Sequence, residues 1–253
     1  MYLCKILKSK KTFFYLFIFV VFVIIIVLAI FYSNIGKKND NIRFKEELIK
    51  KNEIGKNLID KVLYKSVYSK VIIVGDSRME LIEKDKKNLD IPVNYSFIAL
   101  SGSKIDWLEK FAIKDLKKYL DNADSHYKYH VVFNMGVNDF EFCDNVYLKA
   151  KEYFNIYKNV ALKYKNINFY LLSVNPVDEK KIFDSYRCVG RTDKKVRDFN
   201  NELKKLLARD TLKNIFYCDS YSNIKFDSPD GLHYDEKTNQ NIINFISRKC
   251  LNI

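Results

Sequence analysis

The chain is poor in the residues that build metal sites. Its 253 residues include three histidines and five cysteines, and no two cysteines form a CxxC pair. His126 and His130 are four positions apart, but they stand in a polar, aromatic stretch that enters an apolar run, so loop residues are expected there more than ligands. We therefore expect no metal ion, and no motif indicates any other cofactor.

The cysteines show no spacing that fixes their pairing, because connectivity cannot be read from sequence. Cys218 ends the apolar run Ile215-Phe216-Tyr217, and we expect it in the buried core. A disulfide between Cys143 and Cys188 stays open as a less favoured alternative for a domain outside the cell. The full set is Cys4, Cys143, Cys188, Cys218 and Cys250.

Glycine and proline are scarce, with seven and three residues, whereas Lys, Asn, Ile, Tyr and Phe are abundant. Four of the 44 basic residues and none of the 31 acidic ones precede residue 33, so the remaining 40 basic residues exceed the acidic ones by nine. This surplus could steer an anionic polymer or lipid headgroup. The compositional bias of an AT-rich bacterial genome is the favoured explanation. The basic residues are scattered without a binding motif, so no nucleic-acid partner is expected.

One segment lacks charge altogether. Residues 13–32 are twenty uncharged, mostly apolar residues, and at about 1.5 Å per residue they span the roughly 30 Å core of a bilayer. A cleaved signal peptide is the alternative, but the run is longer than a typical signal core and no convincing cleavage site or lipobox-like cysteine follows it. We expect an uncleaved transmembrane helix. Four basic residues flank it on each side, within residues 5–11 and 37–45, so charge does not decide its orientation.

The remaining chain divides into a basic tail, a connecting region and one α/β domain. Residues 1–12 form the tail, residues 33–65 a linker and an amphipathic stalk helix, and residues 66–253 the domain. Within the domain, apolar runs alternate with amphipathic segments. This alternation predicts a five-stranded parallel sheet covered by helices on both faces, a three-layer αβα sandwich. We expect strands at 71–74, 94–99, 129–134, 168–173 and 214–218, and helices at 78–87, 105–121, 145–165, 192–209 and 235–249.

Chemically distinctive residues follow the predicted strands. The run 70–74 ends in Gly75-Asp76-Ser77, the second strand precedes Ser101-Gly102-Ser103, the third precedes Gly136-Val137-Asn138-Asp139, and Asp230-Gly231-Leu232-His233 follows the fifth. The carboxyl ends of parallel strands share one edge of a sheet, so these clusters are expected in one site. A serine needs a base to act as a nucleophile. His233 supplies the base, and Asp230 can orient it. Helix capping by Ser77 and a simple turn at Asp230-Gly231 are the structural alternatives.

The four blocks in this order resemble those of the SGNH (GDSL) hydrolase family, over about residues 66 to 253. The resemblance implies a catalytic triad of Ser77, His233 and Asp230. It also implies an oxyanion hole formed by the backbone N–H groups of Ser77 and Gly102 and the side chain of Asn138. One departure is that Tyr234 follows the histidine where many relatives have proline. Membrane-tethered relatives usually act on envelope material, which favours a domain outside the cell.

Three further residues are candidates for substrate binding. Arg78, beside the nucleophile, could bind a carboxylate or phosphate, and a salt bridge to a nearby acid is an equal alternative. Asn175 is placed by its position after the fourth strand. Trp107, the only tryptophan, could stack on a sugar, although core packing at helical spacing with Phe111 is favoured.

The first functional prediction is a membrane-anchored serine esterase that removes O-acetyl or similar acyl groups from an envelope carbohydrate. An O-acyltransferase using the same residues is the first alternative, and an inactive scaffold or glycan-binding protein of the same fold is the second. The expected partners are the acylated glycan, or another small acyl ester, and the membrane. Oligomeric state is left open by the sequence.

Overall fold

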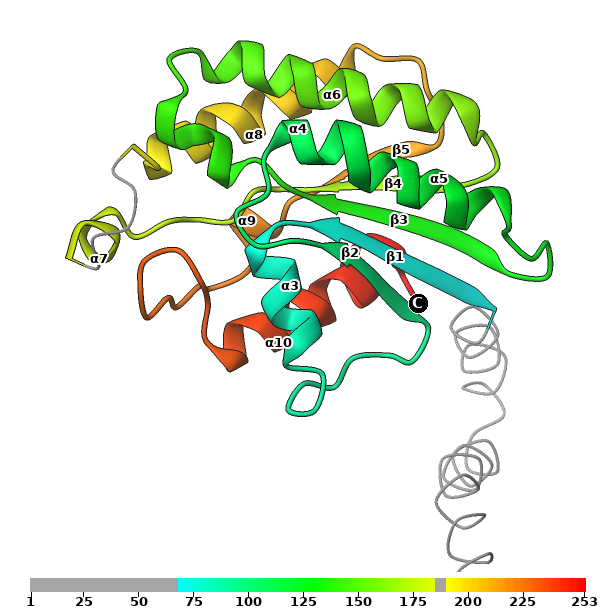
Figure 1. The fold of residues 1–253 in the computed structure, drawn as a ribbon, viewed down its shortest axis with the longest axis horizontal. Helices are drawn as coiled ribbons and strands as arrows, with labels where there is room; N and C mark the ends of the chain where they lie inside the picture. Colours follow the sequence, from blue (N-terminus) through cyan, green and yellow to red (C-terminus); the bar gives the residue numbers. More distant parts are fainter. Residues whose placement is uncertain (1–67, 185–189) are drawn as a thin grey trace, which may run out of the picture. The chain divides into compact units, whose positions relative to one another are not determined.

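A parallel β-sheet lies between two layers of helices (Figure 1). The computed structural model of the chain describes residues 68–184 and 190–253. Contacts within the chain divide it into two units, Met1–Lys61 and Val62–Ile253, and every described residue belongs to the second unit. That unit has the α/β architecture that the alternating sequence pattern predicts.

The strands are runs of β-branched and aromatic residues. Neighbouring strands pair in parallel in the order β2-β1-β3-β4-β5. The two central strands, β1 and β3, are buried along nearly their whole length, as expected when helices cover both faces. The strands are β1 (Ser69–Gly75), β2 (Tyr95–Ala99), β3 (Lys128–Asn134), β4 (Asn168–Leu172) and β5 (Ile215–Cys218).

Alternate residues of the sheet pack against different helix layers. Ile72 and Val74 belong to a core shared with one layer, whereas Val71 and Ile73 belong to a core shared with the other. The first layer comprises α4 (Ile105–Trp107), η1 (Leu108–Ala112), α5 (Ile113–Asp121), α6 (Val146–Lys163) and α8 (Asp193–Ala208). The second comprises α3 (Ser77–Lys84), α10 (Glu236–Phe245) and η3 (Ile246–Leu251).

The strand order places a change of direction between β1 and β3. From β1 the chain passes through α3 to β2 on one side, whereas from β3 it passes through α6 to β4 on the other. The loops after these two adjacent strands therefore diverge. Such a divergence opens the usual ligand crevice of parallel sheets at the carboxyl ends of the strands. Ser77 follows β1 and Asn138 follows β3, so both lie at this point.

All five predicted strands and the five main helices are confirmed near their expected positions. The helix predicted over 105–121 contains a π-helical segment, η1, in its middle. Three short elements were not predicted, because four to six residues are too few to show a helical repeat. They are η2 (Val137–Phe142), α7 (Glu179–Asp184) and α9 (Ser220–Asn223).

No helix within residues 68–184 and 190–253 is long and apolar enough to cross a membrane. The predicted transmembrane helix at 13–32 and the stalk at 33–65 lie outside the described residues. Both stay predictions.

One disulfide was not predicted from the sequence. Cys218, at the end of β5, is buried as predicted, but it is also bonded to Cys250 in η3, with 5.7 Å between their Cα atoms. Cys143 is a free thiol, so the less favoured alternative of a Cys143–Cys188 bridge gains no support; Cys188 itself lies outside the described residues. The observed pair joins residues that only the packing of η3 against the sheet brings together.

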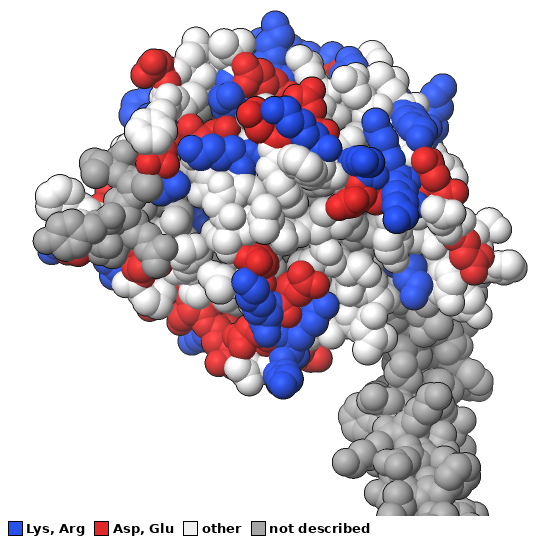
Figure 2. Space-filling model, in the orientation of Figure 1, with Lys and Arg blue, Asp and Glu red and all other residues white. Residues whose placement is uncertain are grey.

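Charges of both signs share the visible surface of the domain. Figure 2 shows acidic side chains lying between the basic ones on this face. Ion pairs among the described residues include Lys204 with Asp219 at 2.6 Å and Lys163 with Asp121 at 3.0 Å. Mixed charge on this face agrees with the compositional explanation for the positive net charge.

Candidate active site

Ser77 lies where the buried strand β1 turns into α3. Gly75 ends the strand, and a Cβ atom at this position would lie 2.2 Å from Cγ of Met79 in the first turn of the helix. The carboxylate of Asp76 caps the helix by accepting the N–H of Arg78 at 3.1 Å. The glycine and the cap together place Ser77 as the first residue of a helix at the edge of the sheet.

Two hydrogen bonds connect Ser77 to the loop that precedes α10. Nε2 of His233 lies 2.9 Å from Oγ of Ser77, and Nδ1 of the same ring lies 2.8 Å from Oδ2 of Asp230. The second carboxylate oxygen, Oδ1, accepts the backbone N–H groups of Leu232 and His233 at 2.9 and 2.7 Å. The structure thus brings the three predicted catalytic residues together, although 156 positions separate Ser77 from His233.

The hydrogen bonds around Asp230 fix its charge. Burial would raise the pKa of Asp230, but the N–H groups of His233 and Leu232 and the imidazole outweigh this effect and lower the pKa to about 2. The carboxylate is therefore ionised at neutral pH and accepts a hydrogen bond from the Nδ1–H group of His233. With Nδ1 protonated, Nε2 is the acceptor that faces the hydroxyl of Ser77, as a general base requires.

Gly231 gives the catalytic loop its shape. Its φ is +82°, and a Cβ atom here would lie 2.4 Å from the carbonyl oxygen of Asp178 and 2.5 Å from the nitrogen of Ile182. Asp178 N also donates to the Gly231 carbonyl at 2.9 Å. The loop that carries Asp230 and His233 therefore packs tightly on the start of α7, which only glycine permits.

The predicted oxyanion donors each keep a hydrogen that no described residue accepts. These are the backbone N–H groups of Ser77 and Gly102 and one of the two side-chain amide hydrogens of Asn138. Gly102 occupies the third position of a turn closed by Ser103 N donating to Leu100 O at 3.2 Å, and its φ of +73° is typical of a type II turn. Free N–H groups at this edge of the sheet could stabilise a developing negative charge.

The turn after β2 is fixed to the start of α3. Leu100 N donates to the Gly75 carbonyl at 3.3 Å. Glu80, in α3, accepts both the backbone N–H and the hydroxyl of Ser101. These contacts hold the Gly102 turn beside the β1–α3 junction that carries Ser77.

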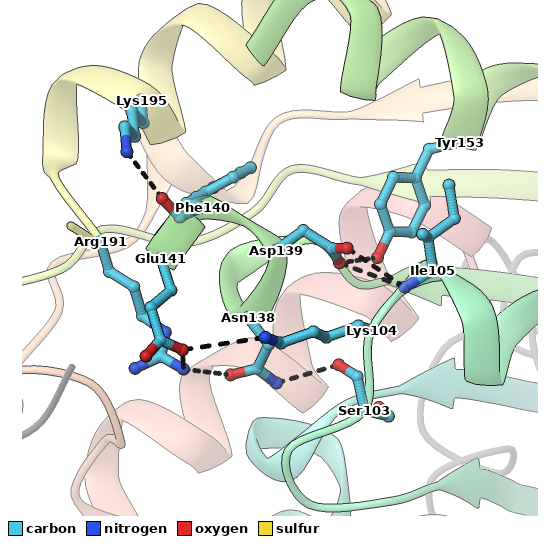
Figure 3. A network of polar contacts seen from close by, with 10 residues as sticks. All are labelled: Ser103, Lys104, Ile105, Asn138, Asp139, Phe140, Glu141, Tyr153, Arg191 and Lys195. Carbon is cyan, nitrogen blue, oxygen red and sulfur yellow. Dashed lines mark hydrogen bonds and ion pairs between the residues drawn. The ribbon is translucent and has the colours of Figure 1, made fainter. Parts of the chain in front are cut away.

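Asn138 joins three segments of the site (Figure 3). Its Nδ2 donates to the Ser103 carbonyl at 3.0 Å, and its Oδ1 accepts from Nη2 of Arg191 at 3.2 Å. Its neighbour Asp139 accepts the N–H of Ile105 and the hydroxyl of Tyr153, so it anchors the start of α4. Sequence analysis missed Arg191, since a single arginine before a helix carries no signal of its own.

Arg78 does not have the environment expected of a substrate ligand. Its side chain is 2% exposed. Nε donates to the Leu232 carbonyl and Nη1 to the Asn175 carbonyl, both at 2.9 Å, and Nη2 donates to the Pro176 carbonyl at 3.2 Å. The guanidinium also lies 4.9 Å from the centre of the Tyr234 ring. Both predicted roles are corrected: Arg78 joins α3 to two loops through backbone carbonyls.

The other two candidates for substrate binding are also placed inside the fold. Asn175 is fully buried, and its Oδ1 accepts the hydroxyl of Ser220. Trp107 is partly buried and packs against the core, which agrees with the favoured alternative. Its predicted helical partner Phe111 is 59% exposed and therefore is not part of that core. Neither residue gains a contact that indicates a ligand.

No group of three His, Cys, Asp or Glu side chains in the described ranges is arranged to hold a metal ion. His126 lies in the turn before β3, as predicted. His130 is instead buried within β3, with its ring 5.8 Å from that of Tyr170. His130 is therefore a strand residue, in agreement with the strand predicted at 129–134 and not with a loop position.

Several solved structures share this fold. A Streptococcus pneumonia protein described as a candidate platelet activating factor is 16% identical, with a TM-score of 0.57, and the match covers 83% of this chain and 98% of that one. A carbohydrate acetylesterase family member from Sinorhizobium meliloti is 13% identical, with a TM-score of 0.53 and coverage of 73% and 100%. Est24, a carbohydrate acetylesterase from the same organism, is 16% identical, with a TM-score of 0.51 and coverage of 72% and 98%.

The sequence itself also matches a family. A comparison with curated proteins found no match. The family model of the GDSL-like lipases and acylhydrolases matches residues 72–246, which include the serine, both oxyanion loops and the histidine. The resemblance predicted from four short blocks is thereby confirmed: the chain belongs to the GDSL-like lipase/acylhydrolase family, the SGNH hydrolases.

Proposed function

We propose that the protein is a membrane-anchored serine esterase that removes O-acetyl or similar small acyl groups from a cell-envelope carbohydrate. The observation that carries this proposal is the hydrogen-bonded triad: Asp230 contacts His233 at 2.8 Å, and His233 contacts Ser77 at 2.9 Å. Ser77 is the first residue of α3, and its backbone N–H group is free to bind an oxyanion.

The reaction proceeds through an acyl-serine. Oγ of Ser77 attacks the ester carbonyl while Nε2 of His233 takes the hydroxyl proton, and the carbonyl oxygen becomes an oxyanion bound by the free N–H groups. The intermediate collapses, the sugar oxygen leaves, and His233 returns the proton to it. A water molecule then attacks the acyl-serine with the same base, which releases the acid and restores Ser77. Asp230 keeps the ring oriented and stabilises the imidazolium in both halves.

Two observations support the choice of substrate and location. Two structural neighbours are carbohydrate acetylesterases, which favours an acylated sugar over a long-chain lipid. The Cys218–Cys250 disulfide favours an oxidising compartment outside the cytoplasm. The uncharged run at 13–32 would then tether the domain to the outer side of the cell membrane.

Hydrolysis of p-nitrophenyl acetate by the full chain in detergent tests the chemistry. Because the triad acts as a unit, Ser77→Ala and His233→Ala should each lower kcat at least about 10³-fold, and the double variant should be scarcely worse than either. Ser125→Ala is the matched control: this exposed serine makes no hydrogen bond to another described residue, so the variant should retain full activity. A fluorophosphonate should label Ser77 alone. A folded Ser77→Ala protein with most of its activity would refute the proposal.

Two parts of the proposal need separate measurements: hydrolysis as opposed to acyl transfer, and the location of the domain outside the cell. Incubation with an acetylated glycan and a sugar acceptor should release free acetate, whereas acetyl transfer to the acceptor would favour the acyltransferase alternative. A protease added to intact cells should digest the domain and spare cytoplasmic proteins. Protection of the domain until lysis would contradict the proposed orientation.

A further inference from the structure

Arg191 stands at a fixed point beside the oxyanion loops. The preceding Gly190 has a φ of +121°, and a Cβ atom there would lie 2.4 Å from the carbonyl oxygen of Glu141. Thr192 caps α8 by accepting the N–H of Lys195 at 3.2 Å. The backbone at Arg191 is therefore constrained on both sides, by packing against η2 before it and by a helix cap after it.

The arginine is buried and makes directed contacts (Figure 3). Its side chain is 9% exposed. Nη2 donates to Oδ1 of Asn138 at 3.2 Å and to Oε2 of Glu141 at 3.3 Å. Glu141 offsets the positive charge, which removes the penalty of an unpaired buried cation.

These contacts determine which way the amide of Asn138 faces. Arginine has only donors, so the atom beside Nη2 must be the amide oxygen. The Ser103 carbonyl has only lone pairs, so the atom beside it must be the amide nitrogen. With one amide hydrogen bound to Ser103, the second is the one left for a substrate oxyanion. A cation at the amide oxygen also polarises the group and strengthens the N–H as a donor.

We propose that Arg191 is a positioning residue for catalysis: it holds the Asn138 amide in the orientation, and with the polarisation, that the oxyanion hole needs. This inference rests on the proposed function, because it requires Asn138 to be an oxyanion donor. Arg191 acts through Asn138, so its contribution should vanish when the amide is removed.

A double-mutant cycle on the full chain in detergent tests this coupling with p-nitrophenyl acetate. Asn138→Ala should lower kcat about 10²-fold, as loss of one oxyanion donor does. Arg191→Ala should lower kcat about 10- to 100-fold and change KM less than about threefold. In the Asn138→Ala background, Arg191→Ala should cost less than about twofold more, because the group it orients is absent.

The chain offers a matched control. Lys195, in the first turn of α8, donates to the Phe140 carbonyl of the short helix η2 at 2.7 Å, but it makes no hydrogen bond to Asn138. Lys195→Ala should leave kcat within about twofold of the wild type. If Arg191→Ala fails to fold, the cycle is run with Arg191→Gln, which retains an N–H donor without the charge; it should lose less kcat than the alanine variant, again only when Asn138 is present.

Three results would overturn the inference, and they separate it from the proposed function. If Arg191→Ala lowers kcat as much in the Asn138→Ala background as in the wild type, Arg191 does not act through the amide. A change confined to KM would identify a substrate contact instead. If Asn138→Ala itself leaves kcat unchanged while Ser77→Ala abolishes turnover, the esterase function stands but the oxyanion role of Asn138, and this inference with it, fails.

Discussion

Arg78 shows how one buried side chain can hold an active site without touching the substrate. Its three donors bind carbonyl groups on the loop after β4 and on the loop that carries His233. The residue is adjacent to the nucleophile in the sequence, so it couples the position of Ser77 to that of its base. Loss of this side chain would leave the Leu232 and Asn175 carbonyls without their donor, which is costly, whereas the Pro176 carbonyl would keep the Tyr234 hydroxyl.

Arg78→Met should therefore destabilise the domain by about 2–5 kcal/mol and lower kcat for neutral and acidic esters alike. Urea unfolding followed by circular dichroism, together with esterase kinetics, measures both effects. Arg248→Met, at an exposed arginine in η3, is the control and should change neither. A stable Arg78→Met protein with a raised KM for acidic esters alone would restore the role in substrate binding.

The carboxylate of Asp230 should leave a signature in the pH dependence of stability. Its pKa is lowered from 3.8 to about 2, so its charged form stabilises the fold above about pH 4, and this contribution is lost as the pH falls toward 2. Asp230→Asn should be less stable than the wild type at pH 7, and the difference should shrink between pH 4 and 2. Unfolding free energies measured from pH 2 to 7 test this, and a pH-independent difference would contradict it.

At the scale of single residues, the sequence predicts which side chains are catalytic better than it predicts which groups the other side chains contact. Ser77, His233 and Asp230 could be found because a nucleophile, a base and a carboxylate are recognisable by type and order. The role of Arg78 could not, because its acceptors are backbone carbonyls 97 to 154 positions away, and every residue has a carbonyl. Arg191 could not be predicted for a related reason: its proposed role depends on the contact with Asn138, which only the fold brings about.

The loops between elements divide into tightly and loosely packed ones, and their glycines show the difference. A Cβ atom at Gly231 would collide with the backbone at Asp178 and Ile182, whereas one at Gly102 would meet nothing within 4 Å. Both glycines have positive φ, of +82° and +73°. Gly231 is thus required both by its positive φ and by the lack of space for a Cβ atom, whereas Gly102 is favoured by its positive φ alone.

Gly231→Ala should accordingly abolish most activity, because the loop must shift and carry Asp230 and His233 with it. Gly102→Ala keeps the backbone N–H group, and its only cost is the left-handed conformation, which destabilises the fold by about 1–2 kcal/mol. This variant should therefore retain most of its kcat. Labelling rates with a fluorophosphonate and thermal unfolding of both variants provide the comparison. Equal losses of activity in the two variants would contradict this difference in packing.

Long elements were predictable and short ones were not. The five strands are continuous apolar runs, and helices such as α6 and α8 repeat their apolar residues over several turns. By contrast, η2 and α7 are six residues each and are shaped by their surroundings, which include Gly136 at a φ of +134° and the Gly231 loop. These short elements carry or support Asn138 and His233, so the details of the site were less predictable than the sheet beneath it.

Across the whole domain, the disulfide ties the C-terminal segment to the edge strand β5. Its cysteines are 32 positions apart, and closing a loop of that length is expected to stabilise a protein by about 3–4 kcal/mol. Cys250→Ser should lower stability by about this amount, and a reductant should have the same effect on the wild type. Cys143→Ser, at the free thiol, is the control. An unchanged unfolding midpoint in Cys250→Ser would show that the bridge contributes nothing.

The contacts of Arg78 also bear on how such a domain can change over generations. Its guanidinium recognises main-chain oxygens at Asn175, Pro176 and Leu232, and a carbonyl is present whichever amino acid occupies a position. For this contact alone, mutations that keep the path of the chain are neutral at those three positions, whereas position 78 has no equivalent replacement. For this contact, the requirement for a particular amino acid is thereby concentrated on position 78 and not on the three positions that supply the carbonyls.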